Sequence, residues 1–113
     1  MSVNKELLKG STVILILSLL EGEPMYGYQM IKEIDKKSGG VFAFKEGTLY
    51  PILHSLEAEG MIESYWTGKE GSRQRKYYRI TKQGEIRLKE KQKEWNIFRS
   101  AVDKVLGEGI AWV

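Results

Sequence analysis

One stretch of the sequence, residues 47–78, limits the possible folds more than any other. Residues 47–59 place apolar side chains at helical spacing, and the runs 61–66 and 75–80 alternate as strands do. Glycines in the loop between the two runs supply the permissive backbone of a hairpin. This order predicts a winged helix-turn-helix, in which helix and hairpin place hydrogen-bond donors and positive charge on one side, where a DNA duplex could lie.

Pro51 indicates where the helix of this stretch begins. Proline has no backbone N–H and is tolerated in the first turn of a helix, where the N–H groups lack intrahelical partners anyway. We therefore expect the helix to begin at Gly47 or Thr48. We expect it to be closed by Gly60, since glycine readily takes the left-handed conformation that ends helices.

Two further helices are predicted before this stretch. Residues 4–21 and 25–37 carry apolar side chains at helical spacing, and the short apolar run 41–44 is compatible with a minor strand. The first of these helices is apolar on nearly every side, so it must be covered on nearly every side. One small domain can hardly provide that cover, which is a first indication of a partner chain.

A long helix is predicted towards the end of the chain. Thr81 is a good N-cap residue, and the helix that follows it can continue to about residue 106. Apolar residues occupy the a and d positions of one heptad frame, in which Lys91 and Gly109 are the exceptions. These apolar residues are Leu88, Trp95, Phe98, Val102, Val105 and Trp112.

The heptad seam predicts a homodimer, because such a seam seeks another helix. Packing on its own domain is the alternative, but the helix is longer than the winged domain is wide, so part of it would stay bare. Leu7, Leu8 and Leu15 of the first helix are expected to contribute to the same interface. The predicted fold class is mainly α (α+β), with residues 1–80 as the winged helix-turn-helix and residues 81–113 as the dimerisation helix of one compact unit.

Length and composition exclude several classes of function. With 113 residues the chain has room for one domain, and without cysteine it can hold no disulfide, thiolate zinc site or cysteine nucleophile. His54 is the only histidine and no nucleophile is paired with a base, so neither an enzyme, a metal site nor a cofactor is expected. The apolar run 13–20 is too short to span a bilayer. We expect a cytoplasmic protein without a membrane partner.

Candidate DNA contacts come from three segments. The net charge is only +3, from 18 basic and 15 acidic residues, but cations gather around the predicted hairpin. Arginine suits bidentate phosphate contacts, and the leading end of a recognition helix meets base edges and phosphates. The predicted contacts are Thr48, Tyr50, Pro51, His54 and Ser55 on the third helix, Lys69, Arg73, Gln74, Arg75 and Lys76 in the wing, and Tyr26 and Tyr28 on the second helix. One of the last two should be core and the other exposed to DNA, and the sequence leaves open which.

Trp95 allows two interpretations. A tryptophan in a helical dimer seam usually serves packing, and the residues alone favour that interpretation. Together with Phe98, Trp95 could also line an apolar slot for a flat aromatic ligand, because the indole ring stacks well on such molecules. The sequence therefore predicts an interface at this position and leaves open a small hydrophobic or aromatic effector.

Several short motifs in the chain are specific. They are G-T-L-Y-P at residues 47–51 and R-K-Y-Y at residues 75–78, supported by Y-G-Y at 26–28 and G-M-I at 60–62. On these motifs the chain resembles the PadR family of bacterial transcriptional regulators. Its length resembles the short, LmrR-like branch of that family, named for a multidrug-binding repressor. Ser55 departs from the pattern, since many relatives carry a basic residue there.

The resemblance implies a homodimer that binds an inverted-repeat operator on double-stranded DNA, usually as a repressor. It also implies that the C-terminal helix of one subunit packs against the first helix of the other. In the LmrR-like branch a tryptophan of the last helix flanks a central pore for planar hydrophobic compounds, and Trp95 matches that position, so ligand binding and packing become evenly balanced there. A rival function from another class is a winged protein-interaction module without specific DNA binding.

Overall fold

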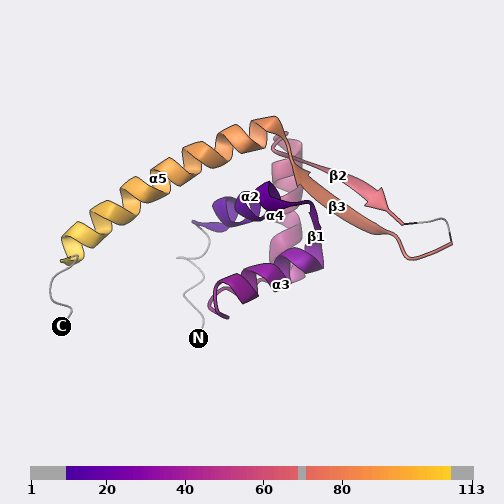
Figure 1. Ribbon diagram of the computed structural model, residues 1–113, viewed down its shortest axis with the longest axis horizontal. Coiled ribbons are helices and arrows are strands. Elements are labelled where there is room, and N and C mark those ends of the chain that lie inside the picture. Colours follow the sequence, from indigo (N-terminus) through magenta and orange to yellow (C-terminus); the bar gives the residue numbers. More distant parts are fainter. Residues whose placement is uncertain (1–9, 69–70, 108–113) are drawn as a thin grey trace.

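Figure 1 shows the computed structural model, which describes residues 10–68 and 71–107. Within these residues, helices pack against a small antiparallel sheet, and the last helix reaches far beyond the rest. The elements in chain order are α2 (Thr12–Gly22), β1 (Met25–Tyr26), α3 (Gly27–Lys37), α4 (Glu46–Ala58), β2 (Ile62–Thr67), β3 (Arg75–Ile80) and α5 (Lys82–Leu106). This mixture of helices with a small winged sheet confirms the predicted fold class, including its long C-terminal helix.

The sheet has the strand order β1-β3-β2, so β3 is its central strand. Tyr78 of β3 stands opposite Met25 of β1 and Ser64 of β2, and these residues share one face with Ile62. Tyr78 and Ile62 are each only 1% exposed. The other face carries the half-buried residues Tyr26, Tyr65 and Tyr77. One face of the sheet therefore belongs to the core, and the other borders solvent.

The core of the domain covers most of α2. The helix is apolar on nearly every side, as the sequence indicates, but its own subunit buries much of it. Of the apolar side chains of α2, only Val13, Ile14 and Leu15 are left partly exposed at the edge of the core. The buried apolar residues are Ile16, Leu17, Leu19, Leu20, Met25, Met30, Ile34, Phe44, Leu49, Leu53, Leu56, Met61, Ile62, Tyr78 and Leu88.

The described helix α2 begins later than the sequence predicts. Gly10 and Ser11 form a turn before it, and the helix starts at Thr12. Both turn residues have low helix propensity, which explains why apolar periodicity alone misplaced the boundary. Leu7 and Leu8, predicted for the dimer interface, lie outside the described residues.

Met25 does not open the second helix, and this part of the prediction is wrong. Met25 and Tyr26 form β1, which pairs with Tyr78 and Tyr77 of the central strand. Helix α3 begins at Gly27, two residues after the predicted start. The partners of β1 lie far along the chain, so the local pattern around Met25 gives no sign of the pairing.

The predicted minor strand at residues 41–44 is also wrong, because these residues, all described, form an irregular loop. Phe44 is 5% exposed and belongs to the core. The backbone amide of Phe42 donates a hydrogen bond to the Ser38 hydroxyl at 2.9 Å. The apolar run therefore anchors the loop between α3 and α4 instead of adding a strand.

Helix α4 begins earlier than the position of Pro51 suggests. The helix starts at Glu46, so Pro51 is its sixth residue and lies past the first turn. Proline has no N–H for the carbonyl of Gly47, four residues before it. Gly47 is exposed, so water can reach that carbonyl and the missing hydrogen bond is tolerated.

Helix α5 joins the domain only at its beginning. The Thr81 hydroxyl caps it by accepting a hydrogen bond from the Gly84 amide at 3.0 Å, as the sequence predicts for this N-cap. Gly84 and Leu88 are its buried residues, and the helix then continues away from the domain to Leu106 (Figure 1). Across the described part of the chain, none of the helices has the length and apolar character needed to cross a membrane.

Candidate nucleic-acid interface

A groove of about 640 Å³ lies where the start of α3, the start of α4 and the hairpin of β2 and β3 meet. It gathers six of the predicted DNA contacts from three separate segments of the chain. It also includes Glu46 and Trp66, which the sequence reasoning did not select. The residues that line the groove are Tyr26, Gly27, Tyr28, Glu46, Tyr50, Trp66, Arg73, Arg75, Lys76 and Tyr78.

The structure distinguishes the two tyrosines that the sequence left unresolved, but neither of them belongs to the core, so that part of the prediction is wrong. Tyr28 is 53% exposed, and the ammonium of Lys32 lies 5.2 Å from the centre of its ring. Tyr26 is half-buried and packs edge-on against Tyr77, with ring centres 5.4 Å apart. The guanidinium of Arg75 lies 4.6 Å from the centre of the Tyr26 ring. Tyr28 is therefore the freely exposed tyrosine, and Tyr26 helps to position a wing arginine.

Tyr50 is less free than the other predicted contacts on α4. Its side chain is partly buried and lies so close to Gly27 that a Cβ there would overlap the tyrosine hydroxyl and come within 2.7 Å of the Tyr50 Cζ atom. Glycine at the start of α3 thus allows α4 to approach closely. This contact joins α3 to α4 and forms the part of the groove wall between them.

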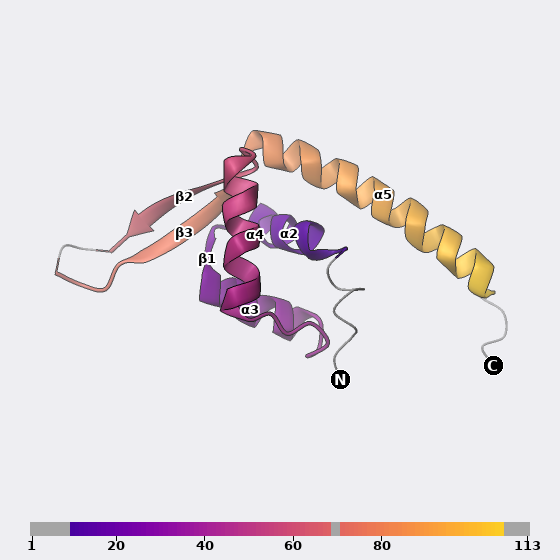
Figure 2. The same cartoon turned by 180° about the vertical axis from the view of Figure 1, so that it is seen from behind.

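The exposed leading part of α4 carries four of the predicted contacts. They lie on the helix that Figure 2 shows in front, with its beginning next to α3. The exposed residues are Thr48, Pro51, His54 and Ser55. A helix N-terminus favours an anion, because its first N–H groups point outward with their partial positive charge.

The wing supplies most of the positive charge of the groove. Arg73, Gln74 and Arg75 are exposed, whereas Lys76 is half-buried, with its ammonium 5.7 Å from the centre of the Tyr78 ring. Lys69, also predicted for this surface, lies outside the described residues. Among the described residues of the lining, three cations therefore stand against the one carboxylate of Glu46.

The carboxylate of Glu63 does not neutralise the cations of the groove, because it is paired with another arginine. Arg79 pairs with Glu63 at 2.6 Å on the other face of the sheet, so its charge is compensated there. Burial raises the pKa of the Tyr78 phenol above its usual value, and the nearby Tyr50 and Glu57 raise this pKa further. Tyr78 therefore stays neutral at physiological pH.

Glu46 could have been found from a local signal, whereas the exposed position of Trp66 in the groove could not. Strand alternation places Trp66 on the same face as Ile62, which is the face turned to the helices. Glu46 stands one residue before the predicted start of α4, so the misplaced boundary removed it from consideration.

A second surface feature lies on α5, far from the groove. Its outer half carries an exposed apolar stripe of Trp95, Phe98, Val102 and Val105, with Trp95 42% and Phe98 59% exposed. The rings of Trp95 and Phe98 stack with centres 6.1 Å apart. Leu88, the first residue of the predicted seam, is fully buried in its own subunit and adds nothing to the exposed stripe.

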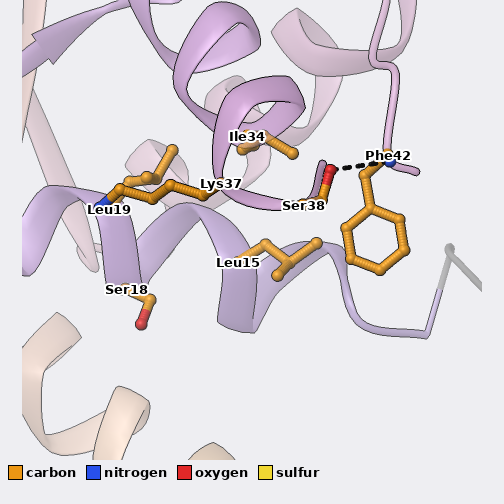
Figure 3. Close-up of a pocket in the computed structure, with 7 residues that line it drawn as sticks. All are labelled: Leu15, Ser18, Leu19, Ile34, Lys37, Ser38 and Phe42. Atoms are coloured by element: carbon orange, nitrogen blue, oxygen red, sulfur yellow. Dashed lines mark hydrogen bonds between the residues drawn. The ribbon is translucent and has the colours of Figure 1, made fainter. Parts of the chain in front are cut away.

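A smaller hollow of about 260 Å³ lies between α2 and α3, at the end of α3 opposite to the groove (Figure 3). Leu15, predicted for the dimer interface, forms part of its wall and is partly buried. The other lining residues are Ser18, Leu19, Ile34, Lys37, Ser38 and Phe42. The hollow is bordered by the apolar side chains of Leu15, Ile34 and Phe42.

The chain matches one protein family along most of its length. The family model described as "Transcriptional regulator PadR-like family" matches residues 16–90. A curated relative, "Uncharacterized protein X" of Lysinibacillus sphaericus, is 35% identical over 101 residues, which are 89% of this chain and 93% of the relative.

Solved structures show the same family. A transcriptional regulator from Clostridium thermocellum is 36% identical with a TM-score of 0.83, and the alignment covers 90% of this chain and 96% of that one. A PadR family transcriptional regulator from Eggerthella lenta is 38% identical with a TM-score of 0.78, covering 90% and 87% of the two chains. Family members are transcriptional regulators, which agrees with the prediction that the chain is not an enzyme. The chain belongs to the PadR-like family of transcriptional regulators.

Proposed function

We propose that this regulator is a repressor that binds an inverted-repeat operator on double-stranded DNA as a homodimer. The observation that carries the proposal is the groove, where the leading end of α4 and the wing cations Arg73, Arg75 and Lys76 border one space. A cationic surface beside a helix N-terminus attracts the phosphate backbone of DNA. With the chromosome of a bacterial cell as its target, the protein would work in the cytoplasm.

The leading end of α4 is the part that would enter the major groove. Thr48 can donate to a phosphate or touch a thymine methyl, and His54 is exposed one turn further on. Arg73 and Arg75 would then hold the flanking backbone or minor groove. A dimer bound in this way would repress by occluding the promoter.

The exposed stripe of α5 supports dimerisation. Beyond Leu88 the helix leaves its own domain, and large apolar side chains remain bare along the predicted seam. Such a stripe is stable in water when a second helix covers it. The hollow beside Leu15 gives a partner helix apolar surface on α2 to pack against. For both α4 helices to enter successive major grooves on one side of a duplex, two-fold pairing must hold them about 34–36 Å apart.

Removing a wing charge tests the DNA-binding proposal. Arg73→Gln should weaken binding to all duplexes and lower the slope of log affinity against log salt by about 0.9 for each lost phosphate contact. Fluorescence anisotropy with a labelled duplex between low and physiological salt measures that slope. Lys93→Gln is the matched control, because this lysine is exposed on α5, away from the groove, and should leave the slope unchanged. Equal slopes for the Arg73 variant and the unchanged protein would remove the wing from the DNA interface.

The rival function, a winged module that docks on another protein, predicts no salt-sensitive DNA binding. A gel-shift assay with the DNA upstream of the protein's own gene separates the two functions. Retardation that weakens with rising salt supports the repressor, and its absence even in dilute buffer supports the rival.

The stacked pair Trp95 and Phe98 favours a further role, the binding of a planar hydrophobic effector at the dimer centre. Both rings are substantially exposed in the subunit, as an aromatic ligand slot requires. Such a ligand could release DNA by changing the angle between the two winged domains. It shifts that equilibrium only if it binds the two arrangements with different affinity.

Tryptophan fluorescence tests the effector proposal. Titration with a planar aromatic compound such as acridine should quench the emission, and Trp95→Ala should remove most of the quenching. The comparison is made in a Trp66→Phe background, so that the groove tryptophan does not contribute. Quenching of the same size with and without Trp95 would contradict the slot.

A further inference from the structure

Trp66 is the large apolar side chain of the groove that the proposed charge contacts leave unexplained. It lies on β2 on the same face as Ile62, but Ile62 is 1% exposed whereas Trp66 is 64% exposed. Burial falls along this face because the hairpin runs out past the helices (Figure 1). The indole therefore overhangs the domain on the side where the groove lies.

The surroundings of Trp66 combine apolar surface with positive charge. Lys76 stands directly opposite it on β3, and Arg73 lines the same groove. Tyr28, 53% exposed, also lines the groove from α3. Leaving so much of an indole in water costs free energy unless a partner covers it.

A second copy of this chain is not the partner that covers Trp66. Figures 1 and 2 show the hairpin and α5 extending to opposite sides of the domain. A dimer formed along the exposed stripe of α5 therefore leaves the groove open. The partner must instead suit a flat apolar ring that lies beside cations.

We propose that the Trp66 indole packs against deoxyribose rings of the bound DNA strand and supplies a part of the affinity that does not depend on salt. The proposal rests on the proposed DNA-binding function. The sugar-phosphate backbone alternates anionic phosphates with apolar sugars, and the groove places Trp66 opposite Lys76 and in the same lining as Arg73. Cations that bind two phosphates would bring the sugar between them onto the indole, whose N–H can also donate to a phosphate.

The test compares the salt dependence of binding in two variants. Trp66→Ala should weaken binding of a labelled duplex about tenfold at every salt concentration, because it removes apolar contact area, and its log–log salt line should run parallel to that of the unchanged protein. Trp66→Phe, which keeps a ring, should recover most of the affinity. Ile86→Ala removes another exposed apolar side chain, 58% exposed on α5, and should bind DNA normally.

Fluorescence gives a second measurement. Adding DNA should change the tryptophan emission of the unchanged protein, and Trp66→Phe should abolish most of that change. If Trp66→Ala binds DNA with normal affinity while Arg73→Gln still lowers the salt slope, the inference about Trp66 is overturned and the DNA-binding proposal stands. A lowered slope in Trp66→Ala would overturn it too, because the residue would then act by placing cations. Absence of DNA binding by the unchanged protein would overturn both the proposed function and this inference.

Discussion

In the proposed homodimer, replacing Phe98 by glutamate is expected to separate the two subunits without unfolding them and to weaken operator binding by more than about 100-fold. Phe98 lies in the middle of the exposed stripe of α5 and is 59% exposed in the subunit, so the charge does not disturb the fold of one chain. In a two-fold dimer each substitution appears twice, and each carboxylate is buried without a partner charge. That cost exceeds what a helical seam of a few apolar residues can offset.

The loss of DNA affinity follows from the loss of the second half-site. A dimer binds both halves of an inverted repeat at once, so the second contact is made at high effective concentration. A single winged domain keeps only one recognition helix and one wing. Its affinity should therefore approach that of non-specific binding, which is typically about 10⁻⁴–10⁻⁶ M at physiological salt.

Sedimentation velocity at micromolar concentration and gel shift together check this prediction. The control is Ile97→Glu, because Ile97 is the adjacent residue, is 63% exposed and lies outside the a and d positions of the seam. This variant should stay dimeric and bind DNA normally. A Phe98→Glu protein that remains dimeric would show that the stripe is not the interface. Circular dichroism checks that the variant keeps its helices, so that any loss of the dimer is not caused by unfolding.

Elements with local signals could be predicted from the sequence. Thr81 caps α5 as expected, because an N-cap depends on a side chain and an amide three residues away. The bounds of β3 and the end of α5 also agree with the prediction, because alternation and helical periodicity are read over a few neighbouring residues.

Features that depend on distant contacts could not be predicted in this way. Met25 joins the sheet because it pairs with Tyr78 on the edge of β3 that β2 leaves free, and Tyr78 lies far along the chain. Phe44 fills the core from an irregular loop. The apolar run around it is the same pattern that a short buried strand would show, so the sequence cannot distinguish the two. Leu88 continues the heptad pattern, but the domain buries it, so the pattern alone cannot show where core ends and exposed seam begins.

The groove was predicted in part, and for a similar reason. Arg73 and Arg75 could be selected from the sequence, because cations gathered around a predicted hairpin indicate a surface that attracts phosphates. The approach of Tyr50 to Gly27 and the overhang of Trp66 depend on how α3, α4 and the hairpin meet. Those positions require the tertiary structure.

Gly84→Ala is expected to destabilise the protein by about 3 kcal/mol, a large part of the stability of a small domain. Gly84 is buried in the first turn of α5, where the Thr81 amide bonds to the Met61 carbonyl at 3.0 Å. A Cβ at Gly84 would overlap that carbonyl oxygen and lie 2.8 Å from the Cγ1 atom of Ile80. Because the obstacle is backbone, α5 must shift away from the hairpin. Urea unfolding at one fixed protein concentration measures the change.

Two opposing effects decide whether Gly84→Ala raises or lowers the free energy of unfolding. Alanine in place of glycine favours a helix by about 1 kcal/mol, so without the overlap the Gly84 variant would be more stable. Gly47→Ala isolates that favourable term, because Gly47 lies in α4 and a Cβ added there would meet nothing within 4 Å. It should leave the free energy of unfolding unchanged or raise it by about 0.5 kcal/mol. If Gly84→Ala proved as stable as Gly47→Ala, the first turn of α5 would not be held against Met61. The direction in which α5 leaves the winged domain would then not be fixed by this contact.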